Sequence, residues 1–341
     1  MYIRKNKIAR LSILVALVFM LTGCNYGENM VITADTKVST WIAYWDLESG
    51  RSELKKVNNK INKLSHFAAY FDVQGRLFVP ENLQEQSKAI VKSNKKLENY
   101  LTIVNDREKA DGSISLKDTE ILKNIFADER KMDAHIDEIV NMTKKLGYQG
   151  IELDYEQIWK DADLGDNFTR FVNRLFVQAL KNNLKLRVVL EPSTKFTHLG
   201  FSSGPEYVVM LYNLYGIHSE PGPKADKNFI NNTLKKMQKL PGEKTIAFAT
   251  GGCIWSNDGK KRFITEIQAV KLAKKHSAEV LRNSASQALN FEYLDENGVG
   301  QTVWYADSET LKYWMSVAKK LGYTNFSIWR LGGNVDIKKI F

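Results

Sequence analysis

The chain has 341 residues, 43% of them hydrophobic, and a formal net charge of +10. This length and composition allow a large buried core, in one big domain or two smaller ones. The basic residues are dispersed among Asp and Glu, and no basic run with interleaved aromatic residues suggests a nucleic-acid partner. We therefore predict a protein that does not bind nucleic acid.

The N-terminus has the pattern of an export signal. An apolar run at 11–21, short for a membrane span, follows four basic residues within the first ten. Leu21-Thr22-Gly23-Cys24 then resembles the lipobox of bacterial lipoproteins, which implies cleavage before Cys24 and diacylglycerol on its thiol. The alternative is an ordinary secretory signal or uncleaved anchor with an incidental cysteine. We expect a signal peptide at 1–23, a lipidated tether at 24–38, and a lipid-anchored protein on the extracytoplasmic face of the cell membrane.

The remaining domain, expected at 39–341, must be stabilised by its core. Cys24 and Cys253 are the only cysteines, so a lipidated Cys24 leaves no intramolecular disulfide. The histidines show no metal-ligand spacing, and no cluster suggests a cofactor, so we predict neither metal nor cofactor. We expect a monomer.

From residue 41 onward, strand-like apolar segments alternate with amphipathic helical segments. Strands are predicted at 41–45, 66–71, 100–104, 150–156, 184–190, 207–212, 245–249 and 326–331. Helices are predicted at 52–64, 83–97, 117–146, 168–180, 228–240, 264–275 and 308–321. This alternation predicts a (β/α)8 TIM barrel. A doubly wound open sheet is the alternative, although no G-x-G-x-x-G loop follows any strand.

One segment interrupts the alternation. Residues 290–294 and 300–304 have strand patterns, and an Asn-Gly turn lies between them. We predict a small β-hairpin insertion at about 278–304, between the seventh strand and the last helix.

The fourth predicted strand, 150–156, carries an unusual row of charges. Its apolar residues at 151, 153 and 155 point to one face, and Glu152, Asp154 and Glu156 point to the other. Neighbouring carboxylates repel and resist burial, so this face is either the solvated side of an edge strand or an acid system with separated pKa values. A closed barrel has no edge strand, and its active site lies at the C-terminal ends of the strands. The barrel therefore places this row at its mouth.

Three motifs carry a resemblance to a known family. Residues 148–156, Tyr-Gln-Gly-Ile-Glu-Leu-Asp-Tyr-Glu, resemble the D-x-x-D-x-D-x-E signature of glycoside hydrolase family 18, the chitinase-like family. Residues 210–213 resemble its strand-six M-x-Y-D, followed by a matching loop at 219–223, and residues 327–330 resemble its strand-eight tryptophan segment. Segments 302–307 and 322–332 are most similar to the branch of spore-germination peptidoglycan hydrolases. The resemblance covers about residues 40–335.

The resemblance implies substrate-assisted, retaining hydrolysis of a β-1,4-linked polymer that contains N-acetylglucosamine: chitin, peptidoglycan or an N-glycan core. Glu156 would protonate the leaving oxygen, and the 2-acetamido oxygen of the sugar would attack the anomeric carbon. Asp154 would orient the acetamido N–H and offset the developing positive charge, and Tyr212 would hydrogen-bond the acetamido oxygen. Glu152 would share a proton with Asp154.

Three positions depart from the family pattern. Gln149 replaces the first Asp of the signature, a position that we expect to be structural. Glu152 replaces the middle Asp and is one methylene longer. Asn213 replaces the strand-six Asp and removes a charge near the leaving group. These departures bear on rate and pH optimum more than on reaction type.

The resemblance also implies a sugar-binding floor at Trp329, although a packed aromatic at the barrel end is the alternative. Met210 and Asn213 belong to the strand-six motif and are predicted to contact substrate. Tyr70 and Tyr44 are predicted to line the same cleft, with core packing as the alternative.

Two other functions are compatible with such a barrel. The first is a carbohydrate-binding protein that no longer cleaves, but binding-only members of the family commonly lose the terminal Glu, and Glu156 is present. The second is an envelope scaffold, which would not need Glu156, Tyr212 and Trp329 together. Glu191, which ends the fifth strand, is either a contact for sugar hydroxyls or a solvated loop charge.

Overall fold

The computed structural model describes residues 36–94, 96–196 and 200–341, which belong to one compact unit, Ala34–Phe341. The expected signal peptide at 1–23, Cys24 and most of the expected tether at 24–38 lie outside the described residues. The last residues of the expected tether, Lys37 and Val38, already belong to the first strand of the structure. Within the described ranges, no helix has the length and apolar character needed to cross a membrane.

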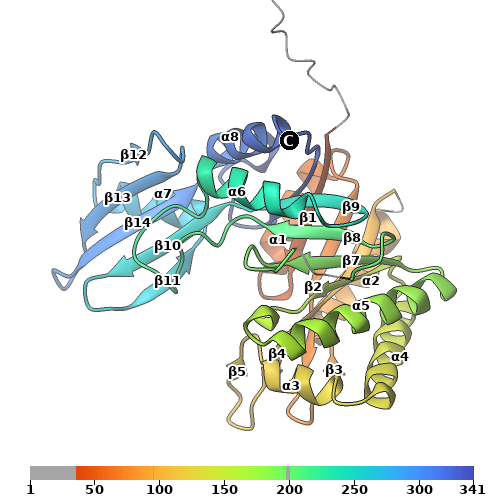
Figure 1. The fold of residues 1–341 in the computed structure, drawn as a ribbon. Coiled ribbons are helices and arrows are strands. Elements are labelled where there is room, and N and C mark those ends of the chain that lie inside the picture. Colours follow the sequence, from red (N-terminus) through yellow and green to blue (C-terminus); the bar gives the residue numbers. More distant parts are fainter. Residues whose placement is uncertain (1–35, 95, 197–199) are drawn as a thin grey trace, which may run out of the picture. The chain divides into compact units, whose positions relative to one another are not determined.

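Eight parallel strands form a closed barrel (Figure 1). Each pairs with the next, and the last pairs with the first. The strands are β1 (Lys37–Ala43), β2 (Lys63–Phe71), β4 (Glu98–Glu108), β6 (Gly150–Asp154), β7 (Lys185–Leu190), β8 (Glu206–Met210), β9 (Glu243–Ala249) and β15 (Asn325–Trp329). This confirms the predicted (β/α)8 barrel. The open-sheet alternative is wrong, because the pairing of β1 with β15 leaves no sheet edge.

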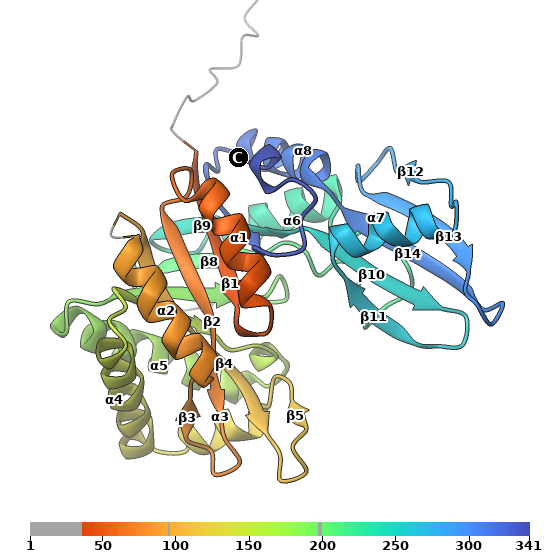
Figure 2. The same ribbon diagram turned by 180° about the vertical axis from the view of Figure 1, so that it is seen from behind.

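Helices cover the outside of the barrel (Figure 2). They are α1 (Leu47–Val57), α2 (Glu81–Ser93), α3 (Thr119–Ile125), α4 (Glu129–Lys145), α5 (Ala162–Lys181), α6 (Lys227–Met237) and α8 (Ser308–Lys319). The single helix predicted at 117–146 is two helices, because Asp128 interrupts it and caps α4 by accepting a hydrogen bond from the Lys131 amide at 2.9 Å. In the described parts of the segment between β7 and β8, no helix forms.

Side chains alternate between faces along a strand and return to the same face every three or four residues along a helix. These two periods decide which residues form the core between strands and helices. Ile151 and Leu153 on β6, and Tyr155 directly after it, are buried among the helices, as the alternation predicts. On α4, the residues spaced three and four apart, including Met132, Ile136 and Ile139, are buried in the same cluster. Burial of each such side chain contributes roughly 1.5–3 kcal/mol to the stability of the folded state. The strand residues on the other face point into the barrel.

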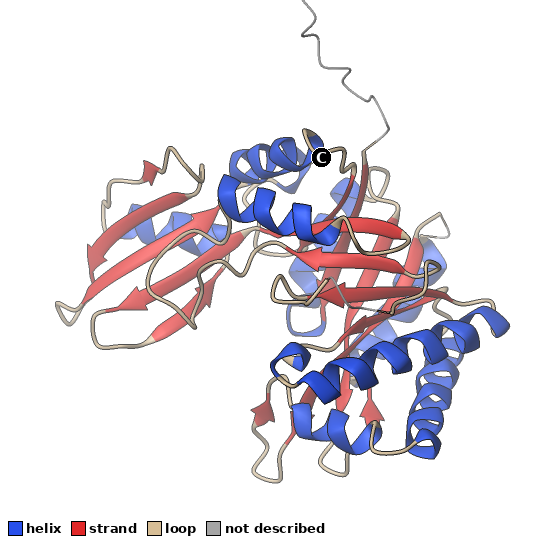
Figure 3. Ribbon diagram, viewed as in Figure 1, coloured by secondary structure: helices blue, strands red, loops and turns tan. Residues whose placement is uncertain are grey.

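A second, antiparallel sheet follows β9 (Figure 3). It contains β10 (Gly251–Ser256), β11 (Lys261–Ile264), β12 (Leu281–Arg282), β13 (Leu289–Leu294) and β14 (Gly300–Ala306), in the order β11-β10-β14-β13-β12, and it is joined by α7 (Glu266–Lys275). The predicted hairpin is present as β13 and β14. The expected insertion at about 278–304 covers only part of this sheet, because the sheet begins at Gly251.

Two glycines explain that difference. Gly251 has a φ of +62°, and a Cβ on Gly252 would lie 1.7 Å from the Trp304 carbonyl oxygen. Gly251 thus turns the chain out of the barrel, and Gly252 lets β10 pack against β14. From the sequence, this pair is expected to end a barrel strand, and the helix at 264–275 is expected to belong to the barrel. The structure assigns both to the inserted sheet.

Candidate active site

The two expected catalytic carboxylates lie at the C-terminal end of β6. Asp154 is the last residue of the strand, and Glu156 follows in the connecting loop. The Asn105 side chain, from the neighbouring strand β4, accepts a hydrogen bond from the Glu156 amide at 2.9 Å and donates one to its carbonyl oxygen at 3.2 Å. These two bonds continue the strand pairing beyond Asp154, so Glu156 is held at a fixed height above the barrel.

Glu152, one layer deeper, is completely buried and surrounded by donors. Its Oε1 accepts hydrogen bonds from Trp41 Nε1 at 2.5 Å and from Thr102 Oγ1 at 2.8 Å. Its Oε2 accepts one from Ser65 Oγ at 2.8 Å and lies 3.4 Å from Arg187 Nε. No hydrogen bond joins Glu152 to Asp154, two residues that the structure describes, and the charge of Glu152 helps to raise the pKa of Asp154. The proton sharing expected of this pair stays a prediction.

Arg187, on β7, extends this network down through the barrel interior. Its side chain is fully buried, and Nε lies 3.5 Å from Glu206 Oε2. Glu206 also accepts hydrogen bonds from Lys63 Nζ at 2.5 Å and Thr245 Oγ1 at 2.7 Å. Burial opposes the charged guanidinium, but Glu206 and Glu152 outweigh it and raise the pKa of Arg187 above its ordinary value. The interior is therefore a set of paired, buried ions.

Asp154 has a different environment. It is buried, yet its Oδ1 has no hydrogen-bond partner among the described residues. Burial raises the pKa of Asp154 well above its ordinary value, and the charges of Glu156 and Glu152 raise it further. A carboxyl group of this kind holds its proton at a pH where an exposed Asp would have lost it. Its open oxygen can accept a hydrogen bond from a ligand.

Glu156 is paired with a cation that the sequence interpretation did not identify. Lys117 Nζ lies 2.5 Å from Glu156 Oε2. Asp106 positions Lys117 by accepting a hydrogen bond from its backbone N–H at 2.8 Å, while Lys117 has a φ of +56°. Burial opposes the charged ammonium, but Glu156 outweighs it and raises the pKa of Lys117. Lys117 is therefore a cation held at the carboxyl cluster.

Two further acidic side chains, Glu191 and Asp106, lie near Glu156 at the barrel mouth. Glu191, after β7, accepts a hydrogen bond from the Gln157 amide at 2.7 Å. Burial, followed by the charge of Glu156, raises the pKa values of both Glu191 and Asp106. Glu191 is thus part of the carboxyl cluster rather than a solvated loop charge. Within the described parts of the chain, no three His, Cys, Asp or Glu side chains are grouped so that they could hold a metal ion.

Tyr212 and Trp329 lie in one apolar cluster at the barrel mouth. Tyr212, Trp329 and Phe67 are partly buried and pack against a buried group that includes Trp41 and Met210. The ring centroid of Trp329 is 5.7 Å from that of Trp41 and 4.9 Å from that of Phe67. Burial, followed by the charge of Asp154, raises the pKa of Tyr212 well above its ordinary value, so its hydroxyl stays a donor.

A row of aromatic side chains leads away from Trp329. Trp45, 53% exposed, lies 6.3 Å from Trp329 between ring centroids and 5.0 Å from Tyr44. Tyr44 lies 5.9 Å from Tyr70, which lies 5.0 Å from Phe78. The predicted positions Tyr44 and Tyr70 are thus brought together on one side of the mouth. Sugar rings stack on aromatic side chains because the sugar ring and the aromatic ring each have an apolar face.

The two remaining departures from the family pattern, Gln149 and Asn213, lie in different parts of the barrel. Gln149 lies at the start of β6, where its Oε1 accepts a hydrogen bond from the Asn99 amide at 2.9 Å and its Nε2 donates to the Gly147 carbonyl oxygen. It ties β6 to β4 far from the mouth, as its expected structural role requires. Asn213 directly follows Tyr212 and is half-buried. The structure therefore places one departure in the scaffold and the other beside the site.

The sequence interpretation missed four side chains of this region: Lys117, Asn105, Asp106 and Arg187. Two signals for them existed. Asn105 and Asp106 directly follow the predicted third strand, where active-site residues of a barrel are expected. Arg187 is a charge on an inward-facing position of the predicted fifth strand, which lies beside the carboxylate strand. Lys117 had no such signal, because its position depends on the loop between β5 (Ile114–Ser115) and α3.

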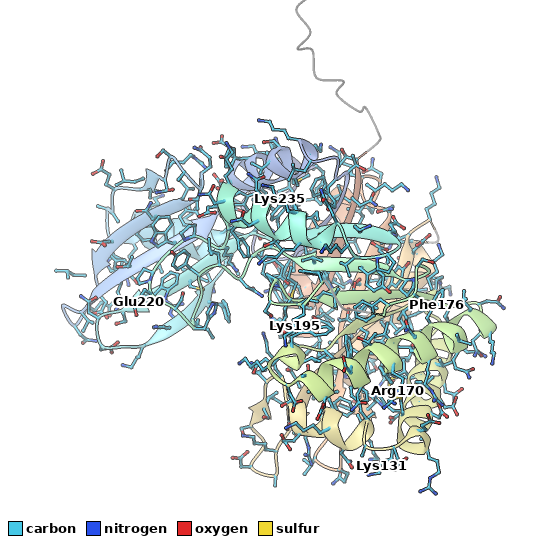
Figure 4. All side chains as sticks on the ribbon, viewed as in Figure 1. Lys131, Arg170, Phe176, Lys195, Glu220 and Lys235 are labelled. Carbon is cyan, nitrogen blue, oxygen red and sulfur yellow. The ribbon has the colours of Figure 1, made fainter. Side chains whose placement is uncertain are left out.

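A hollow of about 600 Å³ also lies outside the barrel, on the surface of α5, where Arg170 is labelled in Figure 4. It is lined by residues of α4 and α5, including Asp133, Arg174 and Val177. None of the predicted site residues lines it. The chemistry is therefore assigned to the barrel mouth.

Comparisons with known proteins agree with this fold. The glycosylase YvbX of Bacillus subtilis strain 168, described as uncharacterized, is 24% identical over 302 residues, 84% of this chain and 85% of that protein. A cortical fragment-lytic enzyme of Bacillus cereus is 23% identical over 306 residues, 83% of this chain and 68% of that protein. The crystal structure of a chitinase from Chromobacterium violaceum superposes with a TM-score of 0.75 at 16% identity, covering 89% of this chain and 98% of that one.

The family model of glycosyl hydrolases family 18 matches residues 40–334, which include every barrel strand except the first residues of β1. That range also contains the carboxyl cluster, Tyr212 and Trp329. The chain belongs to glycosyl hydrolases family 18 and is a glycoside hydrolase.

Proposed function

We propose that this chain hydrolyses a β-1,4-linked polysaccharide containing N-acetylglucosamine by substrate-assisted, retaining catalysis. One observation carries the proposal: Asp154 is a buried carboxyl group with an oxygen that accepts no hydrogen bond from the described residues, and Glu156 lies two residues beyond it. The Asn105 bonds hold Glu156 just beyond the strand, and the charge of Glu156 raises the pKa of Asp154, so the two carboxyl groups are near enough for one sugar to meet both. The open oxygen is placed to receive the acetamido N–H.

The proton can be followed through the reaction. The raised pKa of Asp154 favours its protonated form, and we take that form as the start of the reaction. When the acetamido N–H occupies Asp154, that proton passes to Glu156, which donates it to the leaving glycosidic oxygen. The acetamido oxygen of the substrate attacks the anomeric carbon and forms an oxazolinium ion. Asp154, now anionic, offsets its positive charge, while the Tyr212 hydroxyl donates to the acetamido oxygen.

Among the three polymers that the motifs allow, the relatives favour a bacterial wall glycan. The Bacillus cereus relative is named for lysis of cortical fragments, whereas the Chromobacterium violaceum protein is named as a chitinase. We propose peptidoglycan as the first substrate to test, with chitooligosaccharides and a high-mannose glycopeptide as comparisons. Products read by mass spectrometry distinguish the three. Binding without cleavage of any of them would instead support a carbohydrate-binding barrel.

The mechanism is tested by two measurements on the same protein. A thiazoline analogue of N-acetylglucosamine mimics the oxazolinium ion and should inhibit. Mass spectrometry during turnover of a fluorosugar should find no sugar bonded to the protein, because the nucleophile belongs to the substrate. A stable glycosyl adduct on Asp154 or Glu152, together with no thiazoline inhibition, would exclude the substrate-assisted mechanism.

We also propose that the mature protein is lipid-anchored through Cys24, on the strength of the Leu-Thr-Gly-Cys sequence alone. Replacement of Cys24 by Ala should leave the protein unprocessed or release it from membranes. Mass spectrometry of the mature N-terminus gives the direct reading, and an unmodified Cys24 would refute the anchor.

A further inference from the structure

The segment that follows β8 carries a lysine whose charge is not balanced. Lys224 is half-buried, and its ammonium forms no hydrogen bond or ion pair with any residue in the described ranges. Its Nζ lies 5.9 Å from the ring centroid of Tyr212 and 5.7 Å from that of Phe263. Burial lowers the pKa of Lys224, opposed by the nearby Cys253. A cation in this setting is costly unless a partner of opposite charge binds it.

The backbone holds this lysine in place. The Leu214 amide donates to the Lys224 carbonyl oxygen at 3.0 Å, which closes the base of the segment. At its tip, Trp255 Nε1 on β10 donates to the Ser219 carbonyl oxygen at 2.9 Å. Figure 4 accordingly shows Glu220, the next residue, beside the second sheet. Lys224 is therefore fixed between the barrel mouth and the inserted sheet rather than free in solvent.

Two aromatic side chains lie near the Lys224 ammonium, and one of them is exposed. Phe263 is directly paired with Cys253, so both point to the same face of the second sheet. Phe263 is 63% exposed, whereas Cys253 is buried. On the other side, Tyr212 belongs to the cluster that contains Trp329. The ammonium thus lies between an open ring and the side chain that we assign to the acetamido group.

We propose that Lys224 binds a carboxylate on the glycan, so that the chain prefers hexosamine polymers with acidic substituents over neutral ones. This rests on the proposed function, because it uses Tyr212 as the acetamido contact. The 3-O-lactyl ether of a muramyl sugar is on the ring carbon next to the one that bears the acetamido group. An anion there lies close to whatever side chain holds the acetamido oxygen. Chitin has a neutral hydroxyl at that carbon and offers Lys224 no partner.

The test uses two probes that differ only in charge. One is a β-1,4-linked tetrasaccharide of alternating N-acetylglucosamine and N-acetylmuramic acid with free lactyl carboxylates, and the other is its methyl ester. The readout is the ratio of kcat/KM for the acid to that for the ester. Wild-type protein should favour the acid, and Lys224→Met should lower the ratio by about tenfold. Lys224→Arg keeps the charge and should retain most of the preference.

The matched control is Lys227→Met, at the exposed start of α6 three residues further along. It removes the same net charge from the same part of the chain and should leave the ratio unchanged. Circular dichroism and thermal unfolding confirm that each variant is folded, and Lys224→Gln replaces Lys224→Met if that variant is not.

Failure of the inference is distinct from failure of the proposed function. If wild-type protein cleaves the probes and the acid-to-ester ratio is the same in Lys224→Met, the inference is wrong while the hydrolase assignment stands. If wild-type protein cleaves neither probe, nor chitotetraose, nor the high-mannose glycopeptide, the proposed function is wrong. Calorimetric affinities of the two probes then decide the anion site on their own, since equal affinity for acid and ester in wild-type protein would refute it.

Discussion

Glu152 and Asp154 lie two residues apart on β6 and face the same barrel interior, yet their surroundings are opposite. Glu152 accepts three hydrogen bonds and lies against Arg187, whereas Asp154 Oδ1 has no partner among the described residues. Asp154 Oδ1 is one of five buried side-chain atoms among the described residues that lack a hydrogen-bond partner; Arg187 Nε is another, although two carboxylate oxygens lie 3.4–3.5 Å from it. Buried polar groups normally find partners, and Asp154 lies at the barrel mouth, so its open oxygen indicates a partner that arrives with the substrate. The layer of the barrel that contains Glu152 stabilises the fold, whereas the layer that contains Asp154 has an oxygen that can bind a ligand.

The difference also shows how a family 18 barrel can accept Glu in place of Asp at 152. A longer side chain reaches donors on β1, β2 and β4 and comes within ion-pair distance of Arg187 on β7. Both oxygens of Glu152 accept hydrogen bonds, so these contacts hold the side chain in place without a bond to Asp154. Its remaining influence on Asp154 is the electrostatic one that raises the pKa of that group.

The largest effect expected at the mouth is the loss of turnover in Glu156→Gln. The amide keeps the shape of the side chain but cannot donate the proton, so kcat should fall by about 10²- to 10⁴-fold. Sugar binding should survive. The free energy of unfolding should change little, because Glu156 is at the mouth and its partner Lys117 is 35% exposed. Turnover close to that of wild-type protein would mean that another group is the acid.

In the barrel interior, Arg187→Met should lower the stability of the fold, whereas Glu156→Gln at the mouth should lower turnover. Removing the guanidinium leaves Glu152 and Glu206 buried with one cation fewer, so we expect a loss of about 3–5 kcal/mol in the free energy of unfolding. Lys185→Met, two residues earlier on β7, is the matched control. Lys185 pairs with Glu98 but is 60% exposed, so its loss should cost no more than about 1 kcal/mol. Equal destabilisation by the two variants, measured by urea unfolding, would refute the division into two layers.

Asp154→Asn should separate stability from activity. The folded-state pKa of Asp154 lies above its ordinary value, so the folded protein binds more protons than the unfolded chain as pH rises above about 4, and stability is lost across that interval. Asn carries no such penalty. The variant should be more stable than wild type at pH 7, by about 1.4 kcal/mol for each tenfold difference in proton affinity, and the gain should vanish near pH 3.

The same variant should lose turnover and thiazoline affinity together, because Asn cannot offset the oxazolinium charge. Asp72→Asn provides the control of opposite sign. Burial opposes ionisation of Asp72, but hydrogen bonds from Arg76 outweigh it and lower its pKa, so the stabilising effect of this group is present at neutral pH and lost as pH falls. Asp72→Asn should therefore be less stable than wild type at pH 7. Matching pH trends for the two variants would contradict the assigned directions.

These contrasts also explain what the sequence could predict. The barrel followed from local patterns, because each strand and helix repeats its own period. The positions of Asp154, Glu156 and Trp329 followed from motifs at strand ends. The inserted sheet was only partly predicted, because Gly251 and Gly252 have the composition of a turn, and only their pairing with β14 identifies them as the start of a new strand.

Partner choice could not be predicted in the same way. Whether Glu152 would share a proton or accept hydrogen bonds depends on side chains more than 50 positions away, such as Ser65 and Trp41. The ion pair between Lys117 and Glu156 spans 39 positions and requires the backbone of Lys117 to adopt a positive φ. Such contacts are set by closure of the barrel and by loop conformation, which hydrophobic periodicity does not encode.

The smallest effect is expected for Glu152→Gln, which tests how the two layers communicate. The charge of Glu152 raises the pKa of Asp154, after burial and Glu156, so its removal should lower that pKa. The limb of the pH–activity profile that Asp154 controls should move to lower pH by about one pH unit or less, while the peak rate changes little. Gln keeps an oxygen for Trp41 and Thr102, which limits structural damage. If the peak rate fell as far as in Asp154→Asn with no movement of the profile, Glu152 would be a direct participant in proton transfer and the two layers would be one.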